Sequence, residues 1–267
     1  MEINHKTVLV TGASGGIGAA IAKAMASAGA AEVLLLARNE GALKRVADEI
    51  AAKGCNARVY PVDLSDPGQI STVVKRIMED VGVPDILINN AGSGQWKFLE
   101  DTTTEEIRDM MALPYFAAAW LTQAFLPAMR RRGTGHIVNI SSTASRVVWP
   151  GATAYTAARW AVRGLTEALR ADLHGSGIRV TLYESGPVES DYWRHNPGSR
   201  ERVPKIGKMI RALKPEEVGT AVVNGVRCNA RLVVVPFAMK LIYVQISLFP
   251  RLVQWLMTST GYRCPRG

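Results

Sequence analysis

Short apolar runs alternate with longer amphipathic stretches along most of the chain. The runs are TVLVT (7–11), EVLLLA (32–37), ARVYPV (57–62), DILINN (85–90), HIVNIS (136–141), IRVTLYE (178–184) and RLVVVP (231–236). They are nearly continuous rather than strictly alternating, which is typical of strands covered on both faces. The stretches between them have helical spacing, and the longest lie near 104–131 and 152–174. We therefore predict an α/β fold, a Rossmann-type doubly wound seven-stranded parallel sheet, in a single domain spanning residues 1–267.

Two stretches break this alternation. Residues 192–213 are basic and contain two prolines and two glycines, so we expect a loop with short helices that borders the substrate. Residues 237–260 are strongly apolar but are interrupted by Lys240, Pro250 and Arg251. One interpretation of this segment is a cover for the substrate pocket or an oligomer contact. The other is a segment that lies on a membrane surface.

Composition narrows the class of protein. A hydrophobic content of 48% and a charged content of 21% are typical of a folded globular protein. The three cysteines form no C-x-x-C motif and the four histidines show no metal-ligand spacing, so we expect no metal site and a reducing compartment. No apolar run reaches roughly 18 residues, and no export signal is expected. We predict a cytoplasmic location, with peripheral membrane association left open.

The charge is unevenly distributed. The net charge is +9, and residues 200–214 contain six cations and one acid. Such a run is compatible with a solvated face, an anionic membrane surface or an acidic substrate. Nucleic acid is not expected as a partner, because no reading motif or interleaved aromatic residues accompany the charge.

A glycine-rich turn follows the first predicted strand. The sequence TGASGGIG (11–18) stands where that strand should pass into a helix. Glycine is needed where the backbone turns tightly and approaches a pyrophosphate closely, and the N–H groups of the helix then face the phosphates. The first strand-to-helix junction is the context in which this motif binds a dinucleotide.

The ends of the second and third strands bear on the choice of cofactor. Ala37 and Arg38 stand where NAD-binding chains usually place an acid, so nothing there repels a 2′-phosphate and a guanidinium is available to pair with it. We therefore expect NADP(H), although a surface cation is the alternative for Arg38. Asp63 could accept from the adenine amino group, or it could simply form a turn.

Four motifs in series identify a family. TGASGGIG is followed by NNAG (89–92), NISS (139–142) and YTAAR (155–159). In this order they resemble the short-chain dehydrogenase/reductase family over roughly residues 5–190. The resemblance implies hydride transfer between a nicotinamide and a carbonyl or alcohol. ESGPVES (184–190) looks like the family loop that contacts the nicotinamide carboxamide.

The resemblance also implies roles for individual residues. Tyr155 would be the acid/base, and Ser142, thirteen positions earlier, would orient the substrate oxygen. Arg159 stands where the family has lysine, one helical turn beyond Tyr155 and on the same face. The implied cofactor contacts are Gly12, Ser14, Gly15, Gly16, Ile17, Gly18, Arg38, Asp63, Leu64, Asn90, Ala91, Gly92, Tyr155, Arg159, Gly186, Val188 and Ser190.

The chain departs from the family at two catalytic positions. Arg159 keeps the cation of the family's lysine but not its shape. Pro114 aligns with an asparagine that marks a helix irregularity in the family and whose carbonyl holds a water. We predict an NADP(H)-dependent carbonyl reductase or alcohol dehydrogenase that acts on a small apolar substrate as a homodimer or homotetramer. The alternative is a catalytically impaired NADP(H)-binding protein with a sensing or structural role.

Overall fold

Seven parallel strands form one sheet in the computed structural model, which describes residues 1–92 and 94–263. The strands are β1 (Thr7–Thr11), β2 (Glu32–Ala37), β3 (Asn56–Pro61), β4 (Ile86–Asn89), β5 (Gly135–Ser142), β6 (Ile178–Ser185) and β7 (Leu232–Val235). Their order is β3-β2-β1-β4-β5-β6-β7. All seven predicted strands are confirmed, and so is the doubly wound α/β fold.

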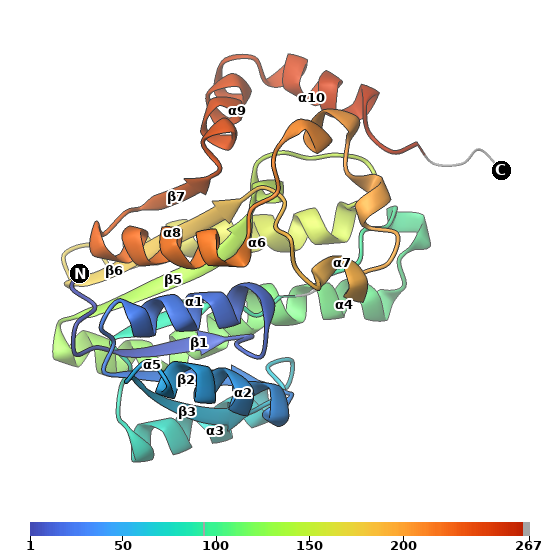
Figure 1. Ribbon diagram of the computed structural model, residues 1–267. Coiled ribbons are helices and arrows are strands. Elements are labelled where there is room, and N and C mark those ends of the chain that lie inside the picture. Colours follow the sequence, from blue (N-terminus) through green and yellow to red (C-terminus); the bar gives the residue numbers. More distant parts are fainter. Residues whose placement is uncertain (93, 264–267) are drawn as a thin grey trace.

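Helices cover both faces of the sheet (Figure 1). The main helices are α1 (Gly16–Ser27), α2 (Glu40–Ala51), α3 (Pro67–Asp80), α4 (Thr104–Met111), α5 (Ala117–Arg132), α6 (Thr153–Asp172) and α8 (Pro215–Arg227). α1, α2 and α8 contribute to the core on one face, and α3, α5 and α6 contribute to the core on the other.

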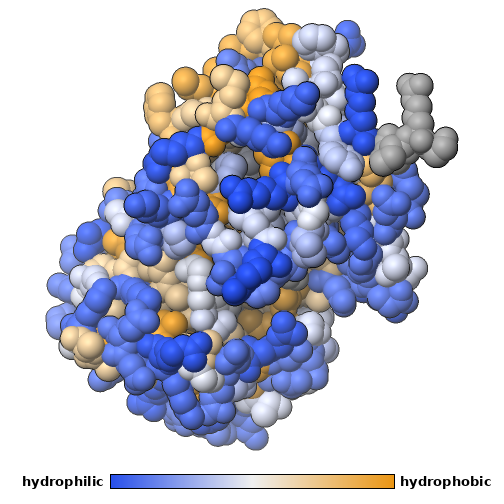
Figure 2. Space-filling view, turned by 45° about the vertical axis from the view of Figure 1, so that its right-hand side comes forward, coloured by the Kyte–Doolittle hydropathy of each residue, from blue (hydrophilic) through white to orange (hydrophobic). Residues whose placement is uncertain are grey.

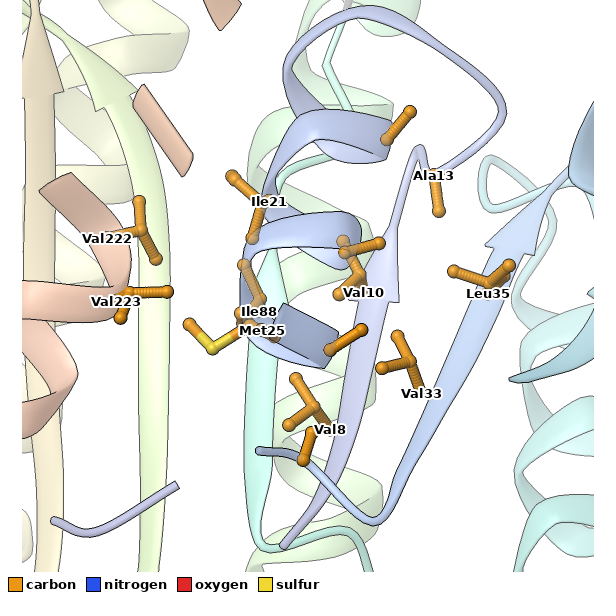
Figure 3. Close-up of a cluster of buried hydrophobic side chains, with 14 of the residues drawn as sticks. Val8, Val10, Ala13, Ile21, Met25, Val33, Leu35, Ile88, Val222 and Val223 are labelled. Carbon is orange, nitrogen blue, oxygen red and sulfur yellow. The ribbon is translucent and has the colours of Figure 1, made fainter. Parts of the chain in front are cut away.

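The pleat of β1 explains why its run of apolar residues is continuous. Val8 and Val10 are fully buried in the core that contains Ile21 of α1 and Val222 of α8 (Figure 3). Leu9 points to the opposite face and packs in the core formed with α3 and α5. Successive side chains leave a strand on opposite faces, so a strand buried on both sides must be apolar at every position.

The strand order reverses between β1 and β4. Moving outward from β1, the chain forms β2 and β3 on one side, then crosses to form β4 to β7 on the other. Such a reversal opens a crevice at the carboxyl ends of the strands, where doubly wound folds bind their ligands. The same edge carries Ser142, which pairs in register with Ser185 at the end of β6.

The helical stretch predicted near 104–131 is interrupted. α4 and α5 are separated by a π-helical turn, Ala112–Phe116, which contains the buried Pro114. Proline lacks an N–H and clashes with the carbonyl one turn earlier, so a wider turn accommodates it better than a regular helix does. The helix irregularity expected at Pro114 is therefore present.

The last two helices lie beyond the sheet. α9 (Phe237–Leu248) and α10 (Pro250–Ser259) pack on each other above β7 (Figure 1), and we call residues 237–259 the cap. Residues 192–213 include α7 (Tyr192–His195) and the two 3-10 turns Arg200–Arg202 and Lys205–Met209. Among the described residues, no helix is long and apolar enough to cross a membrane.

Candidate active site

A cavity of about 920 Å³ opens at the carboxyl ends of the strands. Its walls come from the glycine-rich turn, the ends of β2 to β6, residues 185–210 and the inner side of the cap. Every residue for which the sequence predicted a catalytic or cofactor-binding role lies in this lining. The structure thus brings the predicted residues together, and their individual roles stay predictions.

The glycine-rich turn requires glycine at two positions. Gly12 has a φ of +65°, and a Cβ on Gly18 would lie 2.1 Å from the Gly12 carbonyl oxygen. The turn is tied to the end of β4, because Asn90 Nδ2 donates to the Thr11 carbonyl at 2.9 Å. α1 begins within it at Gly16, and no side-chain hydrogen bond caps the N-terminus of this helix. A close backbone and free N–H groups at a helix N-terminus fit the pyrophosphate of a dinucleotide.

Arg38 and Asp63 both line the cavity, where the sequence predicted contacts with the adenosine part of the cofactor. Ser65 donates to Asp63 Oδ1 through its hydroxyl at 2.6 Å and through its backbone N–H at 2.9 Å. These hydrogen bonds hold the pKa of Asp63 below its usual range, with a smaller contribution from the Arg38 guanidinium. Asp63 therefore forms a turn and faces the cavity at the same time, so the two readings of its role are compatible.

Tyr155 and Arg159 form a buried pair on α6. Each side chain has an exposed fraction of 7%, and the Arg159 Cζ atom lies 4.9 Å from the centroid of the Tyr155 ring. The guanidinium also packs against the backbone of Gly92, since a Cβ there would lie 2.9 Å from Arg159 Nη2. Arg159 Nη1 approaches the Ile140 carbonyl at 3.5 Å, and its Nε has no partner among the described residues. The cation is therefore held over the face of the ring by close packing more than by hydrogen bonds.

Ser142 ends β5 and caps the 3-10 turn Thr143–Ser145. Its Oγ accepts from the Ala144 N–H at 3.2 Å. A hydroxyl oxygen that accepts one bond still has its own hydrogen to donate. Ser142 can therefore donate a hydrogen bond to an oxygen placed in the cavity.

An aromatic wall, which the sequence analysis did not identify, surrounds Tyr155. The Trp96 ring lies 5.4 Å from Tyr155, 5.0 Å from Trp149 and 5.6 Å from Trp193, measured between centroids. Trp96 Nε1 donates to the Tyr192 hydroxyl at 3.0 Å. Burial raises the pKa of Tyr192 well above its usual value, with Tyr155 adding to the rise and Arg159 opposing it. Residues 96, 149 and 193 each follow one of three neighbouring strands, β4, β5 and β6. This shared position after adjacent strands is the feature of the sequence from which the wall could have been predicted.

A buried ion cluster next to the site was also missed. Glu184 is fully buried at the end of β6, where it accepts from the hydroxyls of Ser145 and, at 3.0 Å, Tyr243. The Arg163 and Arg146 guanidiniums lie 3.4 and 3.7 Å from its carboxylate oxygens. Burial, and then the Glu184 charge, raise the pKa of Tyr243. Because Tyr243 belongs to α9, the cluster fastens the cap to the sheet.

Comparisons with known proteins agree with this geometry. The family described as "short chain dehydrogenase" matches residues 6–200. An uncharacterised oxidoreductase of Mycobacterium tuberculosis is 42% identical over 194 residues, which are 70% of this chain and 56% of that protein. Mouse dehydrogenase/reductase SDR family member 7B is 35% identical over 193 residues, 71% of this chain and 59% of the relative. The matched part therefore spans less than two thirds of these relatives.

Solved structures extend the similarity over nearly all of the chain. A short-chain dehydrogenase from Sphingobium yanoikuyae in complex with NADPH superposes with a TM-score of 0.79 at 26% identity, covering 98% of both chains. A metagenomic short-chain oxidoreductase in complex with NADP superposes with a TM-score of 0.73 at 32% identity, covering 88% of this chain and 98% of the other. With the family motifs gathered around one cavity, this chain belongs to the short-chain dehydrogenase/reductase family of oxidoreductases.

Proposed function

We propose that the chain is an NADP(H)-dependent oxidoreductase that interconverts a carbonyl and an alcohol on a small apolar substrate. The observation that carries the proposal is the position of Tyr155 in one cavity with the glycine-rich turn, Ser142 and a buried cation. This combination puts a proton donor, an oxygen-orienting hydroxyl and a dinucleotide cradle around the same space.

The preference for NADP(H) rests mainly on Arg38. It lines the cavity next to Ala37, where no carboxylate would repel a 2′-phosphate. Two similar solved proteins were determined with NADP or NADPH bound, which supports the same assignment. When bound, the nicotinamide supplies or accepts the hydride.

The walls of the cavity favour an apolar substrate. Trp96, Trp149 and Trp193 form one wall, and Leu256 and Met257 of the cap line the cavity as well. Aromatic and aliphatic surface of this kind binds apolar groups and excludes water. Polar specificity would then come from Ser142 and Tyr155 at the reacting oxygen.

Tyr155, Ser142 and Arg159 have separate roles in the proposed proton transfer. In reduction, the Tyr155 hydroxyl donates its proton to the substrate oxygen, while Ser142 donates a hydrogen bond to the same oxygen. The phenolate that remains is stabilised by the positive charge of Arg159. Oxidation runs the same steps in reverse, with the phenolate accepting the proton.

The second candidate function is NADP(H) binding without turnover. It is favoured by the placement of Arg159, whose guanidinium packs on the Tyr155 ring and on Gly92 while its Nε stays without a partner among the described residues. A lysine ammonium group can rotate and form hydrogen bonds in several directions, whereas this guanidinium is fixed by packing. The cation therefore cannot make the same contacts that a lysine would make.

Turnover separates the two candidates. The purified full chain would be screened with NADPH against ketones and long-chain aldehydes, with NADPH affinity measured in parallel. We expect NADPH-dependent reduction that Tyr155→Phe abolishes while cofactor affinity stays within about threefold. NADPH binding with no turnover of any carbonyl would favour the second candidate. Activity that survives Tyr155→Phe would contradict the proposed chemistry.

A further inference from the structure

The outward side of the cap is apolar and exposed. Figure 2 shows apolar side chains gathered at the top of the molecule, over α9 and α10. They belong to both helices, and among them Phe237, Leu248 and Trp255 have exposed fractions of 69%, 65% and 60%. The exposed apolar residues of the cap are Phe237, Leu241, Val244, Leu248, Phe249, Leu252 and Trp255. A contiguous exposed surface of this kind usually marks an interaction site.

Helical geometry separates the two sides of the cap. In α9, residues 237, 241, 244 and 248 fall within an arc of about 60° at about 100° per residue. Met239 and Tyr243 lie on the other side, where they are buried against the rest of the fold. In α10, Leu252 and Trp255 point outward while Leu256 lines the cavity. The inner side of the cap is thus packed against the rest of the fold, and its outward side is exposed to solvent.

The charged residues of the cap are cations. Lys240 and Arg251 are exposed within the cap, and Lys205 and Lys208 are exposed on the neighbouring 3-10 turn. A backbone hydrogen bond of 3.0 Å from Lys205 to Thr260 ties that turn to the end of α10. No Asp or Glu occurs anywhere in residues 218–267. An apolar face that carries and adjoins cations, in a segment without acids, matches the chemistry of an anionic lipid surface.

We propose that the cap docks the protein onto the surface of an anionic membrane. The apolar side chains of α9 and α10 enter the interface while Lys240, Arg251 and the lysines of the 3-10 turn face the lipid headgroups. The helices lie along the surface, since none of the described helices could span a bilayer. A second copy of the chain fits this face less well, because a symmetric contact would bring the two cationic borders together.

Vesicle binding tests this docking. The full chain would be sedimented with vesicles of phosphatidylcholine alone and of phosphatidylcholine with about 30 mol% phosphatidylserine, at low and at high salt. We expect binding that is at least about tenfold stronger to the anionic vesicles at low salt and that weakens as salt is added. A protein that remains in the supernatant with both vesicle types at low salt overturns the proposal.

Variants test which surface is responsible. Leu252→Gln with Trp255→Gln should reduce binding at least about tenfold, since each removes an exposed apolar group from the interface. Trp160→Gln is the matched control, because Trp160 is 49% exposed on α6, outside the cap, and its loss should leave binding unchanged. Lys240→Gln with Arg251→Gln should lower binding to anionic vesicles about tenfold and leave binding to neutral vesicles unchanged. Thermal unfolding of each variant guards against a folding defect.

The depth of insertion gives an independent readout. Brominated acyl chains should quench part of the tryptophan fluorescence, and Trp255→Phe should bind normally but lose that quenching. Wild-type binding by Leu252→Gln with Trp255→Gln would overturn the proposal. A second result would also overturn it. In that result the wild type does not bind vesicles, and size-exclusion chromatography shows a dimer that Leu252→Gln with Trp255→Gln converts to a monomer.

Discussion

Removing the charge of Arg159 while keeping its volume should lower the rate and move its pH optimum upward. Arg159→Met is the suitable change, because Arg159 is only 7% exposed, in a packed site between Tyr155 and Gly92. Methionine removes the charge and still fills much of that space. In the proposed reaction, the cation stabilises the phenolate that forms in the reductive direction. Its effect on catalysis is the difference between its interaction with the phenolate and its interaction with the neutral ring.

The magnitude follows from the separation. A unit charge 4.9 Å from the ring centroid interacts with the phenolate by about 3.4 kcal/mol at an effective dielectric constant of about 20. The same guanidinium already stabilises the neutral ring by about 2 kcal/mol through the cation–π contact, because the pair is buried. The difference, about 1.4 kcal/mol, corresponds to roughly a tenfold loss of kcat at neutral pH. Arg159→Lys, which keeps the charge, should retain more of the rate than Arg159→Met.

The assay is kcat with NADPH and the best carbonyl substrate, measured from about pH 6 to pH 10. The Arg159→Met variant should keep its lower rate to a higher pH than the wild type, because a phenol without a cation beside it holds its proton more tightly, whereas the lysine variant should follow the wild-type profile. An NADPH titration separates this effect from weaker cofactor binding, which would change KM for NADPH instead. A methionine variant with wild-type kcat and an unshifted profile would refute the role assigned to Arg159.

Three further changes test other parts of the structure. NADPH should bind at least about tenfold tighter than NADH, and Arg38→Asp should reverse that order in a cofactor titration; equal affinities would sink the NADP(H) assignment. Pro114→Asn should raise kcat without changing NADPH affinity, and an unchanged or lower kcat would show that the proline is no handicap. Burial lowers the pKa of His136 to about 4 from 6.5, so the unfolded state binds more protons between these pH values. The free energy of unfolding should therefore fall, by at most about 3 kcal/mol, as the pH drops from 6.5 to 4. His136→Gln should flatten that slope, and a wild-type slope in the variant would contradict the argument.

The strands and the glycine-rich turn could be predicted because their signals are local. A strand such as β1 is buried on both faces, so Val8, Leu9 and Val10 form an unbroken apolar run that can be read directly. Gly12 has a positive φ, and a Cβ on Gly18 would clash with the Gly12 carbonyl, so glycine is favoured at both positions. In both cases the residues that determine the local structure lie within one short segment of the sequence.

The aromatic wall and the Glu184 cluster could not be predicted in the same way. Trp96 and Trp193 are almost one hundred residues apart in the sequence and meet only because β4, β5 and β6 are neighbours in the sheet. Glu184 looked like part of a loop motif, and only the fold brings Arg163 of α6 and Tyr243 of α9 to its carboxylate. The position of the Arg159 guanidinium over the ring face also depends on its contact with Gly92, which is distant in sequence.

The two-sided cap has a thermodynamic consequence. Leu256 on its inner side lines the cavity, Trp255 beside it points outward, and Tyr243 ties the same pair of helices to buried Glu184. Any agent that shifts the position of α9 and α10 by binding outside must therefore change the affinity of the cavity for its ligand. Reciprocity requires the ligand to change the affinity of the outer face by the same factor. A filled cavity and an empty one should accordingly leave the protein distributed differently between surface-bound and free populations.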